Sequence, residues 1–116
     1  MTKPNQEFKS YLHSKDTSPL FLVGDSLAIL GDFPEDSIDF CMTSPPYWGQ
    51  REYQNGGIGL EADYKMYVKD LCAIFGEVKR VLTNTGSFWL NIGDTYLNKH
   101  LVGIPWRVAF QLMDDQ

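Results

Sequence analysis

The feature that most limits the possible folds is a long amphipathic segment, residues 61–82, flanked by two short apolar runs. Its apolar side chains recur at steps of three and four residues, the period of one helical face: Tyr64, Tyr67, Val68, Leu71, Phe75, Val78, Val81 and Leu82. The flanking runs, residues 38–43 and 87–92, are closed by turn-forming residues, which predicts strands. Strand, helix and strand in this order predict an α/β fold with parallel strands.

Three further elements follow from local signals. Residues 20–23 form a continuous apolar run that stops at a glycine, which predicts a strand buried on both faces. Asp25 or Ser26 then caps a short helix. A last helix begins near Pro105, with the proline in its first turn, and runs toward Met113.

Two segments are expected to lie outside these elements. Residues 84–86, Asn-Thr-Gly, should end the long helix as a turn. The polar residues 1–18 show no sustained period, so we expect a loosely held lead-in segment. Residues 19–116 then form the folded unit.

Composition narrows the class of protein. The 116 residues carry 15 acidic against 10 basic side chains, a formal net charge of −5, and 43% are apolar. This fits a small globular domain and argues against a general coat for nucleic acid, which needs clustered Lys and Arg. Without an apolar run of membrane-spanning length or a signal peptide, we expect a cytoplasmic protein and no membrane partner. Cys41 and Cys72 lack metal-ligand neighbours, so we expect reduced core residues and no metal.

The most informative stretch is residues 43–48, Thr-Ser-Pro-Pro-Tyr-Trp, at the carboxyl end of a predicted strand. Two consecutive prolines fix the backbone and remove two amide donors. The carbonyls and the Ser44 hydroxyl that remain accept hydrogen bonds, and Tyr47 offers a flat apolar ring. This chemistry suits an exocyclic amine on a flat base, and a plain proline turn with a surface aromatic explains it equally well.

The motif resembles that of the amino-group DNA methyltransferases, found in restriction-modification systems, which methylate the exocyclic nitrogen of cytosine or adenine with S-adenosylmethionine. The resemblance extends, in order, over residues 21–26, 34–39, 43–51, 59–61, 80–82, 87–94 and 101–107. It implies a partial Rossmann-like, S-adenosylmethionine-dependent methyltransferase fold, with parallel strands, flanking helices and an incomplete sheet. The serine version of the motif looks like the cytosine-N4 branch; the adenine-N6 branch is the alternative.

The resemblance also implies roles for individual residues. Ser44 and a carbonyl of the Pro45-Pro46 pair would hold the target amine, and Tyr47 would stack on the flipped base. Catalysis would rest on positioning and hydrogen-bond electrostatics, without a covalent enzyme intermediate. Asp25 looks like the acidic residue that contacts the adenosine part of the cofactor, with Thr43 beside it; a helix cap is the alternative for Asp25.

Further residues are candidates for contact with the DNA substrate. Arg51 and Lys99 are phosphate-contact candidates, although solvated surface charge also explains both. Trp48 lines the base pocket or packs against the neighbouring loop. Asn91 and Asp94 close the last strand at the same edge as the motif, and for Asp94 a turn or cap role is equally expected.

The sequence departs from the family in lacking the glycine-rich cofactor turn, a strand followed by G-x-G that opens a helix. Gly57-Ile58-Gly59 has the letters but follows no apolar strand, so we expect a surface turn. The chain therefore looks like the catalytic half of a permuted enzyme: a truncated gene, a fragment or one piece of a split methyltransferase. A non-catalytic remnant, or a methyltransferase for amides or amines of protein or RNA, are the alternatives.

The missing half predicts how the chain assembles. In a complete sheet of this family, two strands would separate residues 20–23 from residues 38–43. Without them these strands pair directly, leave open edges or are completed by another chain, and open apolar edges favour association. We expect a homodimer or a complementary chain that carries the cofactor-binding half.

Overall fold

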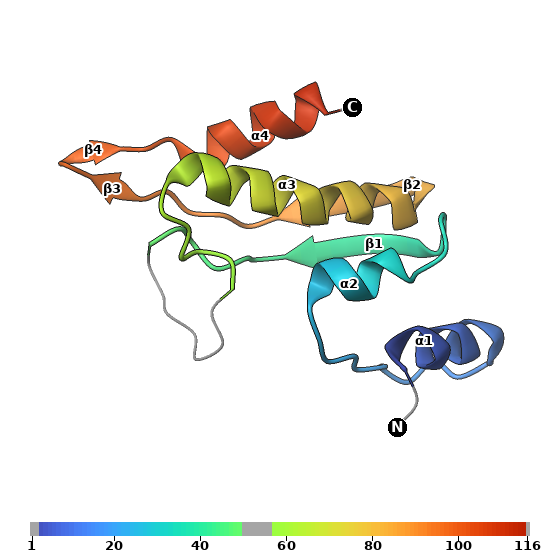
Figure 1. Cartoon of the computed structure of the whole chain (residues 1–116). Coiled ribbons are helices and arrows are strands. Elements are labelled where there is room, and N and C mark those ends of the chain that lie inside the picture. Colours follow the sequence, from blue (N-terminus) through green and yellow to red (C-terminus); the bar gives the residue numbers. More distant parts are fainter. Residues whose placement is uncertain (1–2, 50–56, 116) are drawn as a thin grey trace.

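A computed structural model describes residues 3–49 and 57–115 of the chain. Figure 1 shows its elements, which follow the chain in this order: α1 (Pro4–His13), α2 (Ser26–Gly31), β1 (Ile38–Thr43), α3 (Tyr64–Val81), β2 (Leu82–Leu90), β3 (Tyr96–Leu97), β4 (His100–Leu101) and α4 (Ile104–Asp114). Over the described ranges, no helix combines the length and the apolar character needed to cross a membrane.

The centre of the fold is a parallel pair of strands, β1 and β2, joined through α3. Thr43 pairs with Leu90 and Cys41 with Phe88, so both strands end at the same edge of the sheet. β1 has the predicted bounds, and the predicted α/β fold with parallel strands is confirmed.

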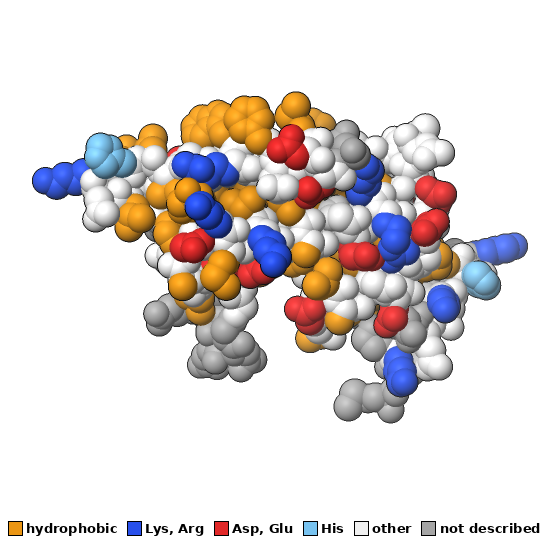
Figure 2. Space-filling view, turned by 45° about the horizontal axis from the view of Figure 1, so that its top comes forward, with side chains coloured by type: hydrophobic (Ala, Val, Ile, Leu, Met, Phe, Trp, Pro, Cys, Tyr) orange, Lys and Arg blue, Asp and Glu red, His pale blue; other side chains and the backbone are white. Residues whose placement is uncertain are grey.

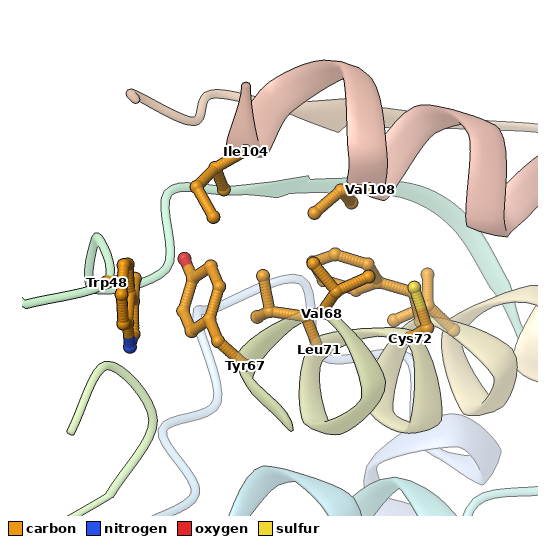
Figure 3. Close-up of a cluster of buried hydrophobic side chains, with 9 residues drawn as sticks. Trp48, Tyr67, Val68, Leu71, Cys72, Ile104 and Val108 are labelled. Carbon is orange, nitrogen blue, oxygen red and sulfur yellow. The ribbon is translucent and has the colours of Figure 1, made fainter. Parts of the chain in front are cut away.

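One face of this sheet packs against α3. Cys41, Phe88 and Leu90 lie against the buried cluster of α3 and α4, in which Tyr67, Ile104 and Val108 are fully buried (Figure 3). In the strand alternation the neighbouring side chains point to the opposite face. There Phe40, Met42 and Trp89 are exposed, so this face is open in the described part of the chain.

The predicted strand at residues 20–23 is wrong. These residues form no strand, and Phe21 and Val23 are 84% and 91% exposed. A strand needs a hydrogen-bonded neighbour, and within the described residues β1 pairs with β2 alone. The apolar run therefore carries a strand signal but has no partner here.

The predicted lead-in at residues 1–18 is also corrected, because Pro4–His13 form the helix α1. Proline stands in its first turn, where a missing N–H costs little. One aromatic contact anchors it: Phe8 is buried and stacks on Phe33, with ring centroids 3.7 Å apart. This contact joins α1 to a residue 25 positions further along the chain, which no local pattern reports.

The boundary between α3 and β2 differs from the prediction. α3 begins at Tyr64 because the Asp63 carboxylate accepts hydrogen bonds from the amides of the first turn. It ends at Val81, and the strand starts at once, so the predicted turn at residues 84–86 lies inside β2. A register irregularity opposite Ile38 and Phe40 accommodates the extra residues.

Two short helices and a hairpin complete the molecule. α2 is capped as predicted, with the Ala28 amide donating to Asp25 Oδ2 at 3.0 Å. α4 matches the predicted last helix. The β3–β4 hairpin was not predicted; its two turn residues, Asn98 and Lys99, have φ of 52° and 66°, the left-handed conformation of a tight hairpin turn.

Candidate active site

The motif after β1 lies beside the segment that follows β2. The Asn91 amide donates to the Thr43 carbonyl at 3.0 Å, which extends the parallel ladder to the last residue of β1. The segments that follow β1 and β2 therefore run side by side. Ser44 and Asn91 are exposed there, at one edge of the sheet. Carboxyl edges of parallel strands are where ligands of α/β sheets bind.

Tyr47 is half-buried, and its ring lies against the backbone of Gly93. A Cβ added at Gly93 would lie 2.5 Å from Tyr47 Cε2, closer than real side chains approach. Only glycine leaves room for the ring in this position. Gly93 is thus a site residue that sequence reasoning treated as a simple strand end.

The backbone of the motif is held from inside the molecule by Tyr67 of α3. Its hydroxyl donates to the Pro46 carbonyl at 2.7 Å, and Tyr67 is completely buried. Burial, and then the charges of Glu61 and Tyr47, raise the pKa of the Tyr67 hydroxyl well above its ordinary value, so it stays a donor. The helical period had marked Tyr67 only as a core residue.

A second support comes from the turn at residues 57–59. The Gly49 amide donates to the Gly59 carbonyl at 2.8 Å, and a Cβ at Gly59 would lie 3.2 Å from the Tyr47 carbonyl oxygen. The Gly59 amide donates to Glu61 Oε2 at 2.9 Å. Gly57-Ile58-Gly59 is a turn, as predicted, but Gly59 is buried rather than at the surface, and this glycine lets the chain approach the motif closely.

Trp48 lies in the buried core, 9% exposed. Its indole N–H donates to the Glu61 carbonyl at 2.9 Å, and its own carbonyl accepts from Thr95 Oγ1 at 2.6 Å. Its ring meets Tyr64 edge-on, with centroids 6.3 Å apart. The Trp48 side chain therefore packs in the buried cluster beside α3.

Asp94 forms a cap for α4. Its carboxylate accepts hydrogen bonds from the amides of Thr95, Gly103 and Ile104 at 2.8–3.0 Å. Burial raises the pKa of this carboxyl, but the three amide bonds and the Arg107 charge outweigh burial, so the pKa lies below its ordinary value. This arrangement favours the cap role over contact with substrate.

The remaining candidates are placed as follows. Asp25 is exposed and caps α2, and Lys99 is exposed at the tip of the β3–β4 hairpin. Thr43 is half-buried at the end of β1. Arg51 lies outside the described residues.

The described residues place polar groups at the carboxyl edge of the sheet, but they hold no glycine-rich cradle for a cofactor. Ser44, Thr43 and Asn91 offer hydroxyl, amide and carbonyl groups at one edge, whereas the glycine-rich cradle for a methionine group is absent from the sequence. Over the ranges 3–49 and 57–115, no group of three His, Cys, Asp or Glu side chains is arranged to hold a metal ion. A cavity of about 770 Å³ lies elsewhere, between α3 and α4.

Comparison with known proteins points to one family. A family profile described as DNA methylase, covering the N6 and N4 types, matches residues 38–116. The type II methyltransferase M.SmaI of Serratia marcescens is 36% identical over 90% of this chain. M.XycI of Xanthomonas campestris pv. cyanopsidis is 41% identical over 79% of the chain.

Two solved structures share the fold. The PvuII DNA methyltransferase, described as cytosine-N4-specific, superposes with a TM-score of 0.65 at 33% identity, covering 80% of this chain and 32% of that one. A putative DNA modification methylase of Thermus thermophilus gives 0.64 at 26% identity, covering 79% and 38%. The chain spans 46% of M.SmaI and 41% of M.XycI, less than half of either.

Proposed function

The chain belongs to the N6/N4 DNA methylase family, and from this we propose that it forms the amine-binding side of a DNA methyltransferase with cytosine N4 as its target. The observation that carries the proposal is the placement of residues 44–47. Their backbone is fixed at the carboxyl edge of β1 while Ser44 stays exposed. A rigid, acceptor-rich edge beside an aromatic ring is what an exocyclic amine on a flat base requires.

The chain's own residues act by binding and orienting the target base. The Ser44 hydroxyl and a motif carbonyl accept the two amine hydrogens, which draws the nitrogen lone pair out of conjugation with the ring. The Pro46 carbonyl already accepts the buried Tyr67 hydroxyl, so the Pro45 carbonyl is assigned to the amine. Tyr47 stacks on the flipped base.

S-adenosylmethionine supplies an electrophilic methyl group when it is bound. Thr43 and Asp25 are proposed to contact it from this chain, with the second oxygen of the Asp25 carboxylate left for that purpose beside its cap hydrogen bond. The groups that would cradle its methionine part come from elsewhere, because the sequence holds no such turn.

A complementary polypeptide that carries the cofactor-binding half is the proposed partner. Phe21, Val23 and the open sheet face with Phe40, Met42 and Trp89 are apolar and exposed. Hydrophobic side chains also gather over the outer face of α4 (Figure 2), where Trp106, Phe110 and Met113 are exposed. Exposed apolar surface of this kind marks an interaction site, and a homodimer is the alternative occupant.

The test is methylation of DNA by the complemented protein. The chain is mixed with labelled S-adenosylmethionine, DNA of mixed sequence and a polypeptide carrying the unmatched part of M.SmaI, and the product nucleosides are separated. We expect N4-methylcytosine, lost in Ser44→Ala and retained in the control Lys79→Ala, which changes an exposed side chain in the last turn of α3. Methyladenine alone would refute the cytosine assignment.

A non-catalytic remnant is the second candidate, favoured by one observation: the glycine-rich cofactor turn is absent from all 116 residues. It predicts no methyl transfer with any complement, although the chain folds and its motif keeps its geometry. Methyl transfer in any complemented mixture that needs Ser44 excludes it.

A further inference from the structure

We infer that Tyr67 is a positioning residue, which fixes the Tyr47 ring at the site through a single peptide unit. Tyr67 lies on α3, and its hydroxyl reaches the Pro46 carbonyl at 2.7 Å. The inference rests on the proposed function, because it assigns Tyr67 a part in presenting the ring that stacks on the base.

The geometry of proline makes this one hydrogen bond decisive. The proline ring fixes φ of Pro46, so ψ is its remaining soft dihedral angle. The direction of the Pro46 carbonyl reports that angle. The peptide bond between Pro46 and Tyr47 is planar, so a hydrogen bond that holds the carbonyl also sets the direction in which the Tyr47 Cα leaves.

The prolines also leave this stretch without internal hydrogen bonds to stabilise it. Pro45 and Pro46 have no amide hydrogen, so the motif cannot be held as an ordinary strand. Tyr67 supplies a donor from a helix more than twenty residues away. The Tyr47 ring also lies against Gly93. Tyr47 is therefore held at its backbone by Tyr67 and at its ring by Gly93.

The donor itself is fixed. Tyr67 is completely buried, and Figure 3 shows its hydroxyl reaching toward the chain between Trp48 and Ile104. The Pro46 carbonyl lies in a partly buried position, so losing its donor there costs free energy unless the carbonyl turns toward water. The Pro46–Tyr47 peptide is therefore expected to rotate when the hydroxyl is removed, which moves the ring.

The variant Tyr67→Phe removes the hydroxyl and keeps the buried ring. Tyr64→Phe is the matched control, since Tyr64 lies one turn earlier on α3 and its hydroxyl has no hydrogen-bond partner within the described ranges. The Tyr64 ring packs against Trp48 and Arg107, which phenylalanine preserves.

The first measurement uses NMR on the full chain and requires no activity. In the wild type we expect a slowly exchanging Tyr67 hydroxyl proton, whereas the Tyr64 hydroxyl exchanges rapidly. In Tyr67→Phe the amide and ring signals of Tyr47 shift, and in Tyr64→Phe they do not. Unchanged Tyr47 signals in Tyr67→Phe, or a rapidly exchanging Tyr67 hydroxyl in the wild type, would overturn the inference.

The second measurement is methylation by the complemented protein. Loss of one net hydrogen bond predicts a fall in kcat of about three- to tenfold in Tyr67→Phe, with KM for DNA changed by less than about twofold, and no change in Tyr64→Phe. A purely structural role would lower the apparent kcat only through a smaller folded fraction, so kcat per folded molecule would stay unchanged, as would the Tyr47 signals of that fraction; this outcome would overturn the inference. If no complement restores methylation, the proposed function fails while the NMR result still decides the role of Tyr67.

Discussion

The motif edge and the open sheet face both carry aromatic side chains, but they differ in how much of their surface the chain itself covers. At the motif edge, Tyr67, Thr95 and Glu61 hold the backbone or the indole of residues 46–48 by hydrogen bonds of 2.6–2.9 Å. On the open face, Phe40, Met42 and Trp89 contact solvent. The motif edge is held by contacts within this chain, whereas the open sheet face has no covering element within the described residues.

Two tryptophans give the largest expected contrast. Trp48→Ala removes a buried ring and leaves the Glu61 carbonyl without its donor, so we expect a loss of about 3–5 kcal/mol in the free energy of unfolding. Trp89→Ala on the open face, where the ring is 60% exposed, should cost below about 1 kcal/mol. Urea unfolding of both variants measures the difference, and equal losses would break the comparison.

A second prediction concerns Asp94, which follows β2 and belongs to the internally held part of the molecule. Asp94→Ala removes the acceptor for three amides, and we expect a loss of about 2 kcal/mol in unfolding free energy at neutral pH. The native pKa is lowered, so this contribution is present above the ordinary value of 3.8 and disappears as pH falls through the native pKa.

The control for this prediction is Asp94→Asn, which keeps a neutral acceptor. Unfolding measured from pH 7 to pH 2 should show the wild type losing its advantage over Asp94→Asn toward the acid end. An advantage that stays constant over that range would contradict the assigned cap role.

An effect of similar size is expected at Gly93. Gly93→Ala places a methyl group against the Tyr47 ring, and overpacking of this kind costs about 1–3 kcal/mol. Gly76→Ala is the matched control, because a Cβ there meets nothing within 4 Å and the residue lies inside α3. It should stabilise the chain by about 0.5–1 kcal/mol. A neutral Gly93→Ala would show that the ring is free to move.

Local signals in the sequence were sufficient for most of the fold. The α3 face, the Asp25 cap and the proline at the start of α4 each depend on residues within one or two turns. The strand at residues 20–23 failed because a strand also needs a neighbour, and no local pattern reports whether one exists. α1 was not predicted, because its contact through Phe8 and Phe33 joins distant positions and leaves no helical period in the sequence.

The candidate site also contains residues that a local signal identifies and residues that no local signal identifies. Residues 43–47 were singled out because consecutive prolines and a tyrosine are informative wherever they stand, but their local chemistry fitted a plain proline turn equally well, and the resemblance to a family favoured a site. The residues that hold them could not be recognised: Tyr67 meets Pro46 across 21 positions and Thr95 meets Trp48 across 47. Gly59 and Gly93 lie within the segments that resemble the family, but no local pattern gave their role, which comes from the close approach of another segment.

Hydrogen exchange of the isolated chain tests most directly whether the motif edge forms without a partner. We expect strong protection of the amides of Asn91, Gly49 and Ile104, which donate to Thr43, Gly59 and Asp94 respectively. Residues 20–24 should exchange at rates close to those of an unfolded chain. Rapid exchange at Asn91 and Gly49, at rates equal to those of residues 20–24, would contradict the account.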